Sequence, residues 1–134
     1  MATWIGGCLC RRVRYEATGD PVRSGICHCR NCQHYTGSAF EPFVIFPTAS
    51  VNVTGEPKTF EHRGDSGRIV GRCFCPNCGS GVVNLDPAHG MTVILVGTLD
   101  DPTVFQPTIE IQCDTALPWA HFVSNRIRFS GMPG

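Results

Sequence analysis

The fold of this chain depends on Phe74-Cys75-Pro76-Asn77-Cys78-Gly79. Proline and asparagine followed by glycine favour a tight turn, which brings the two sulfurs of a C-x-x-C pattern side by side. A second pair stands near the start of the chain, in Cys8-Leu9-Cys10. In an extended segment residues i and i+2 point to the same face, so this pair can also offer both sulfurs to one ion.

Together the two pairs supply the four sulfurs of a tetrahedral zinc site, in which each sulfur lies about 2.3 Å from the metal. The spacing therefore predicts a closed structural zinc site that ties the N-terminal strand to the middle of the chain. Metal binding at such a site contributes free energy of folding directly, because the site does not exist in the unfolded chain. Its predicted ligands are Cys8, Cys10, Cys75 and Cys78.

A third group lies between these two, in Cys27-His28-Cys29-Arg30-Asn31-Cys32. Its cysteines, Cys27, Cys29 and Cys32, offer three ligands, and zinc with three protein ligands keeps a position for water or substrate. A thiol substrate would suit an ion that is already surrounded by soft sulfur ligands. We therefore expect a second zinc ion with an open position here, and two zinc ions per chain.

The alternative is that another side chain closes this second site. Cys73 and Cys113 are the two cysteines left over, and the simplest expectation is that they are ordinary free thiols. His28 and His34 are the histidines nearest in sequence. Because His28 stands between two ligands whose side chains point to the other face, we expect it behind the ligands or at the surface.

Length and composition indicate one folded domain over residues 1–134. The chain has 42% hydrophobic and 16% charged residues, which favours a packed globule over disorder. Lys+Arg and Asp+Glu both number 11, so the basic excess of a general nucleic-acid binder is missing. The longest clean apolar run, Val93-Ile94-Leu95-Val96, is far shorter than the roughly twenty residues of a membrane-spanning helix.

The N-terminus has no charged segment followed by an apolar stretch, so no secretory signal is predicted. We therefore expect a cytoplasmic protein. In that reducing compartment close-set cysteines act as metal ligands or reactive thiols and not as disulfides. The odd total of nine cysteines leaves at least one without a disulfide partner in any case.

Alternating and short apolar runs predict a mainly β fold with at least seven strands. The expected strands are residues 13–17, 43–46, 51–54, 58–62, 68–74, 82–85 and 92–96. Gly64-Asp65-Ser66-Gly67 stands between two of them and predicts a hairpin turn. Since 15 glycines and 10 prolines are spread along the chain, the longest helix expected is a short one over residues 30–35.

The three ordered cysteine motifs resemble those of one known family. They are Gly6-Gly7-Cys8-Leu9-Cys10 leading into Val13-Arg14-Tyr15, Cys27-His28-Cys29-x-x-Cys32 followed by Gly37-Ser38, and Phe74-Cys75-x-x-Cys78-Gly79. With them the chain resembles the glutathione-dependent formaldehyde-activating family, which also includes the centromere protein V-like proteins. The resemblance covers residues 4–122, nearly the whole chain.

The resemblance implies a fold of small coiled antiparallel β-sheets, similar to Mss4 and held by zinc. It implies a structural zinc on the first four cysteines named above and a catalytic zinc on Cys27, Cys29 and Cys32. The implied activity is that of a carbon–sulfur lyase, an S-(hydroxymethyl)glutathione synthase that joins formaldehyde and glutathione. The implied partners are glutathione or a similar small thiol and a small aldehyde, with no nucleic acid and no membrane.

A cationic side chain should bind the carboxylates of such a thiol. The candidates are Arg30, Arg63, Arg68 and Arg72. Trp119 and Phe122 are candidates for the apolar walls of the cleft, although both are equally well explained as ordinary core residues.

One departure from the family pattern lies in the C-terminal segment. Many members carry Pro-x-x-His-Ile before a tryptophan, whereas this chain reads Pro107-Thr108-Ile109-Glu110-Ile111, so that Glu110 replaces a histidine. Two other functions compete with the enzyme: a non-catalytic zinc-binding interaction module of the Mss4-like type, and a store of zinc or thiols. The relatives associated with chromatin or microtubules depend on basic or disordered extensions. No such stretch occurs in this sequence, which favours the enzyme.

Overall fold

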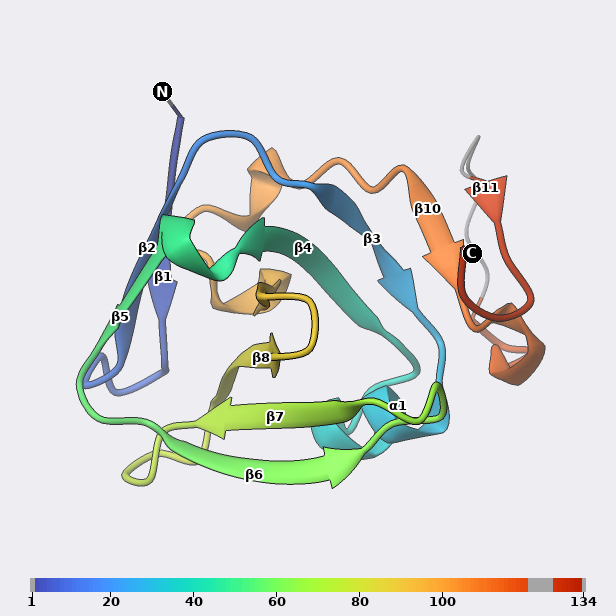
Figure 1. Ribbon diagram of the computed structural model, residues 1–134, viewed down its shortest axis with the longest axis horizontal. Coiled ribbons are helices and arrows are strands. Elements are labelled where there is room, and N and C mark those ends of the chain that lie inside the picture. The colour runs from blue at the N-terminus through green and yellow to red at the C-terminus, as the bar shows by residue number, and fades with distance from the viewer. Residues whose placement is uncertain (1, 121–126, 134) are drawn as a thin grey trace.

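The computed structural model describes residues 2–120 and 127–133, and this part of the chain consists mainly of strands (Figure 1). The strands are β1 (Thr3–Gly7), β2 (Arg14–Thr18), β3 (Arg23–Cys27), β4 (Glu41–Pro47), β5 (Val51–Thr54), β6 (Lys58–Arg63), β7 (Ile69–Phe74), β8 (Gly81–Asp86), β9 (Met91–Leu95), β10 (Ile109–Ile111) and β11 (Ile127–Arg128). The α-helix of the described residues is α1 (Arg30–Thr36), and short 3₁₀ helices cover Thr48–Ser50, Val96–Thr98, Pro102–Val104 and Cys113–Thr115.

The strands form two sheets. The smaller sheet has the order β1-β2-β5 and the larger has the order β11-β10-β3-β4-β9-β8-β7-β6. In Figure 1 the smaller sheet stands at the left, β10 and β11 lie at the right, and β6 and β7 run along the bottom. Most neighbours are antiparallel, but β10 pairs in parallel with both β3 and β11. The expected mainly β fold is confirmed, and its larger sheet is mixed.

Local turn chemistry places the predicted hairpin and helix. Strands β6 and β7 flank the predicted turn, in which the amide of Gly67 donates to the carbonyl of Gly64 at 2.9 Å. Helix α1 ends at Gly37, whose φ of 67° and bond to the Gln33 carbonyl form a left-handed cap. The sequence pattern does not predict β1, β3, β10 or β11, because these short strands lack a clear alternation of apolar and polar residues.

The main core lies between the two sheets, and β4 separates it from a second apolar cluster. Val44 and Phe46 of β4 are fully buried in the main cluster. Phe43 belongs to the second cluster, together with Ile109 and Ile111 of β10 and the three central cysteines. Successive side chains on a strand point to opposite faces, so β4 contributes to both clusters.

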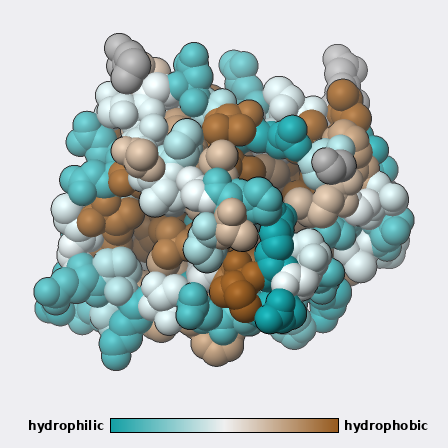
Figure 2. Space-filling view, in the orientation of Figure 1, coloured by the Kyte–Doolittle hydropathy of each residue, from teal (hydrophilic) through white to brown (hydrophobic). Residues whose placement is uncertain are grey.

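Apolar side chains on the molecular face of Figure 2 gather in separate patches between polar ones. Among the described residues, the large apolar residues with the highest exposure lie far apart in the sequence: Leu9 (85%), Trp119 (69%) and Ile127 (63%). In the part of the chain that the structure describes, no helix has the length and apolar character needed to cross a membrane.

Gly55 allows the end of β5 to pass against the loop that carries Cys8 and Cys10. Its φ is 92°, and an added Cβ would lie 1.7 Å from the carbonyl oxygen of Arg12 in that loop. A side chain at this position would therefore push the loop away, in addition to the strain of the left-handed backbone.

We expect Gly55→Ala to lower the free energy of unfolding by about 1–3 kcal/mol more than Gly67→Ala does. Gly67 is the matched control, since its φ is 87° and nothing lies within 4 Å of an added Cβ. In the control variant only the strain of the left-handed backbone lowers the free energy of unfolding, by about 1–2 kcal/mol. Urea unfolding of the three proteins measures both losses, and equal losses would show that the Cys8–Cys10 loop moves aside freely.

Candidate metal centres

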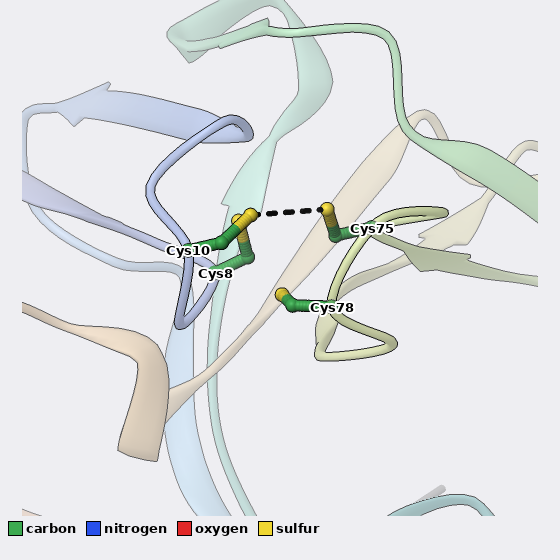
Figure 3. A group of neighbouring side chains, drawn as sticks. All are labelled: Cys8, Cys10, Cys75 and Cys78. Carbon is green, nitrogen blue, oxygen red and sulfur yellow. Dashed lines mark hydrogen bonds between the residues drawn. The ribbon is translucent and has the colours of Figure 1, made fainter.

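Four sulfurs from two distant loops point toward one another (Figure 3). Cys8 and Cys10 come from the loop after β1, and Cys75 and Cys78 from the turn between β7 and β8. The Sγ atoms of Cys8 and Cys10 lie 3.6 Å apart, and those of Cys10 and Cys75 lie 3.7 Å apart. Sulfurs placed tetrahedrally about 2.3 Å from one ion are separated by about 3.8 Å. The four side chains could therefore hold one metal ion.

The turn between β7 and β8 orients its two sulfurs through the backbone. Gly79 has a φ of 78°, and its amide donates to the Cys75 carbonyl at 2.8 Å. The amide of Asn77 donates to Cys75 Sγ at 3.4 Å. The hydroxyl of Ser80 lies 3.2 Å from Cys78 Sγ and lowers the pKa of Cys78 to about 5. The turn thus favours the thiolate form of Cys78, which is the form that a metal ligand must adopt, whereas the pKa of Cys75 is raised.

The three central cysteines gather at the junction of β3 and α1. Cys27 is the last residue of β3, Cys29 is the N-cap of α1, and Cys32 lies in its first turn. The Sγ atom of Cys29 accepts the amide of Cys32 at 3.3 Å, so it also satisfies one free amide of the helix start. All three are buried, with sulfurs within 4.8 Å of one another, and could hold a metal ion.

The pKa values of these three thiols are shifted in different directions. Hydrogen bonds from Cys27 and Cys32 lower the pKa of Cys29 to about 2, and the bond between Cys27 and Cys29 raises the pKa of Cys27 to about 12. The pKa of Cys32 is also raised, by its bonds to Cys27 and Cys29 and by burial. Cys29 is therefore the sulfur of the three that loses its proton most readily, and a bound metal would ionise all three.

Within the described residues, no fourth histidine, cysteine or carboxylate lies within 4.8 Å of all three sulfurs, although Glu41 Oε2 lies 3.6 Å from Cys32 Sγ. Cys73 is buried elsewhere, and His34 is exposed on α1. Cys113 lies in a different group, beside His28 and Glu110. The described residues therefore give no support to the alternative in which a leftover cysteine or a histidine closes the site.

The three sulfurs form part of the wall of a cavity of about 180 Å³. The strands supply its apolar walls, among them Phe43, Ile45, Val70, Leu85 and Val93. Trp119 does not line this cavity: its side chain is exposed and lies at a separate hollow. Phe122 lies outside the described residues.

A buried polar network lies beside Cys32, in the wall of the same cavity. It joins Glu41 of β4, Arg72 of β7 and Asn84 of β8, all of them buried. Arg72 Nη1 lies 3.5 Å from Glu41 Oε1, and Asn84 Nδ2 donates to Glu41 Oε2 at 3.0 Å. Burial raises the pKa of Glu41, and the charge of Arg72 partly opposes that rise. Glu41 and Asn84 are not among the site residues predicted from the sequence. The pattern that could have indicated Glu41 is a carboxylate directly before the apolar run 42–46.

Two of the four candidate arginines, Arg68 and Arg72, line the cavity, and Arg30 and Arg63 do not. Arg72 is buried against Cys32, as described above. The side chain of Arg68 is about a third exposed (34%) and pairs with Asp86 at 3.0 Å. Arg68 is therefore the candidate with access to both the cavity and solvent.

His28 is fully buried and faces β10. Its Nε2 lies 2.8 Å from Oε1 of Glu110, which is also buried. The parallel pairing of β10 with β3 sets this contact, because it places Glu110 opposite Ile26 and Ile111 opposite Cys27. His28 thus stands behind the ligands and not at the surface, and Glu110 is its partner.

We expect the double variant Cys73→Ser/Cys113→Ser to bind as much metal as the wild type, because neither sulfur belongs to the four-cysteine or the three-cysteine group, in which we expect the two zinc ions; Cys113 lies instead beside His28 and Glu110. Elemental analysis of protein purified under reducing conditions measures the metal content. Loss of one ion per chain from the double variant would show that one of these cysteines completes the central site.

Comparison with known proteins gives one family and one fold. No curated protein matches the chain. A crystal structure of a Rhodobacter sphaeroides protein, a Northeast Structural Genomics target, is similar with a TM-score of 0.52. The two share 17% identity over 72% of this chain and 87% of the other, which shows a common fold. A family model described as glutathione-dependent formaldehyde-activating enzyme matches residues 3–115. Since that match spans most of the chain, the protein belongs to the glutathione-dependent formaldehyde-activating enzyme family.

Proposed function

We propose that the protein is a zinc-dependent carbon–sulfur lyase that joins glutathione and formaldehyde, in the manner of an S-(hydroxymethyl)glutathione synthase. The observation that supports this most is the group of three buried sulfurs in a cavity wall, without a fourth ligand among the described residues. The family match adds the two reactants, since the family is described by glutathione and formaldehyde.

The donor sets support zinc at both centres. All seven ligands are sulfurs, which suits a tetrahedral zinc ion in a reducing compartment. The four-cysteine group is the structural site in this proposal, and Cys27, Cys29 and Cys32 hold the catalytic ion. Zinc at the open site would stabilise a substrate thiolate and polarise a carbonyl oxygen.

The reaction requires that a thiolate and an aldehyde are bound together in one site with little water. The thiolate sulfur adds to the carbonyl carbon, so that a C–S bond forms and the carbonyl oxygen takes up the proton that the thiol has released. The cavity is smaller than the roughly 300–1,000 Å³ of pockets for drug-sized ligands, which suits the thiol end of the substrate and a one-carbon aldehyde. Its apolar walls exclude water, and Arg68 is placed to bind a carboxylate of the tripeptide at the rim.

The recessed position of the central cysteines also favours the enzyme over the interaction module. A protein-binding module uses exposed surface, whereas here the central cysteines are buried in a recess. We further infer that the protein works in the cytoplasm, because none of the nine cysteines is paired in a disulfide.

We expect zinc-replete protein to bind glutathione and to bind S-methylglutathione much more weakly. The methylated compound keeps both carboxylates but cannot supply a thiolate to the open position. Titration calorimetry with the two ligands under the same conditions measures the difference. Equal affinities, or no binding of either at millimolar concentration, would contradict capture of a thiol at zinc.

We expect two zinc ions per chain, of which a mild chelator removes one without unfolding the protein. Cys78→Ser should lower the free energy of unfolding by several kcal/mol, because it opens the closed site. Cys29→Ser should abolish the easily removed zinc while the protein stays folded, since serine is also a good N-cap for α1. Metal analysis and circular dichroism melts of both variants measure this, and equal loss of stability would contradict the two roles.

A further inference from the structure

We infer that Arg72 is the counter-ion of the three-cysteine centre, and that its charge selects an anionic ligand, such as a thiolate, for the open position. The inference rests on the proposed function, because it concerns the same site. It adds the residue that determines which chemical class of ligand binds there.

The guanidinium of Arg72 is held against the ligand Cys32. Arg72 lies on β7 with 5% of its surface exposed. Its Nη1 and Nη2 atoms lie 3.8 and 3.9 Å from Cys32 Sγ. Its Nε donates to Nε2 of His62 at 3.0 Å, and its central carbon lies 5.1 Å from the centre of the Tyr35 ring. These contacts with β6 and α1 fix the planar group with its two terminal nitrogens toward the sulfur.

The charge of the centre explains why a fixed cation is needed. Three thiolates and a divalent ion sum to one negative charge, and a thiolate at the open position raises this to two. An excess of buried negative charge is costly unless a cation accompanies it. Arg72 is the buried cationic side chain, among the described residues, that contacts one of the three cysteines. A neutral ligand adds no charge and so gains little from Arg72.

Glu41 lies on the same side of the centre with the opposite charge. Its Oε1 lies 3.5 Å from Arg72 Nη1, and its Oε2 lies 3.6 Å from Cys32 Sγ. Removal of the arginine and removal of the carboxylate should therefore change the affinity for an anion in opposite directions. A purely structural network would behave differently, because loss of either partner would weaken binding.

The test measures ligand binding to Co²⁺-loaded protein, in which a new fourth ligand changes the visible absorption spectrum. The probes are 2-mercaptoethanol and glutathione, which bind as thiolates, and imidazole, which binds as a neutral ligand. We expect Arg72→Gln to weaken binding of both thiols by about tenfold to a hundredfold and to leave imidazole binding unchanged. Glu41→Gln should tighten thiol binding, and Arg72→Lys should keep most of the wild-type affinity.

Two further variants make the test decisive. Arg63→Gln is the matched control, an arginine on neighbouring β6 that does not line the cavity, and should bind every probe as the wild type does. The double variant Arg72→Gln/Glu41→Gln leaves no unpaired buried charge, so it covers the case in which Arg72→Gln does not fold. Its affinity for thiols should be about tenfold to a hundredfold lower than that of Glu41→Gln, with imidazole binding unchanged, because these two variants differ only at Arg72; equal thiol affinities would overturn the inference.

The outcomes separate this inference from the proposed function. Equal weakening of thiols and imidazole by Arg72→Gln, or weaker thiol binding in Glu41→Gln, would overturn the role of Arg72. If 2-mercaptoethanol shows the expected pattern while glutathione does not bind, the role of Arg72 stands and the proposed function is wrong. If neither thiol binds the wild type, both are overturned.

Discussion

Four thiolates within 4.8 Å of one another repel, and only a shared cation makes that arrangement stable. In this protein the four belong to two loops that the fold must bring together: the loop after β1, which belongs to the smaller sheet, and the turn after β7, which belongs to the larger one. A metal ion on Cys8, Cys10, Cys75 and Cys78 would therefore fix the position of one sheet against the other. The main core, formed by side chains of both sheets, then packs behind this junction.

The same larger sheet builds the cavity, because its strands present the central cysteines and the groups that surround them. Strand β3 delivers Cys27, and the helix start that follows delivers the other two sulfurs. Strands β4, β7 and β8 carry Glu41, Arg72 and Asn84, whose side chains meet next to Cys32. The site thus depends on the register of several strands, and a shift of one residue in any of them would turn its side chain to the opposite face.

This division explains what could be predicted from the sequence. The cysteine groups, the hairpin at Gly64–Gly67 and helix α1 depend on residues a few positions apart, so local spacing and turn chemistry are enough to predict that they form. The contact of His28 with Glu110 depends on parallel pairing between β3 and β10, more than eighty residues apart in the chain, and no local pattern encodes it. Glu41, Arg72 and Asn84 meet for the same kind of reason. No spacing rule links these three residues in the sequence, and only the fold shows that Glu41 and Arg72 contact Cys32 while Asn84 contacts Glu41.

Differences in burial separate the two centres chemically. Cys10 of the four-cysteine group is exposed and Cys78 is partly exposed, so water can offset the negative charge of that site. Cys27, Cys29 and Cys32 are all buried, so their charge must be offset from within the protein. The buried Arg72 lies 3.8 Å from Cys32 and also lines the cavity, so its charge is close both to the sulfurs and to a ligand in the cavity. A metal on the four-cysteine group could therefore rely on water to offset its charge, whereas at the buried group the nearby charges of Arg72 and Glu41 would favour and oppose a further anion, respectively.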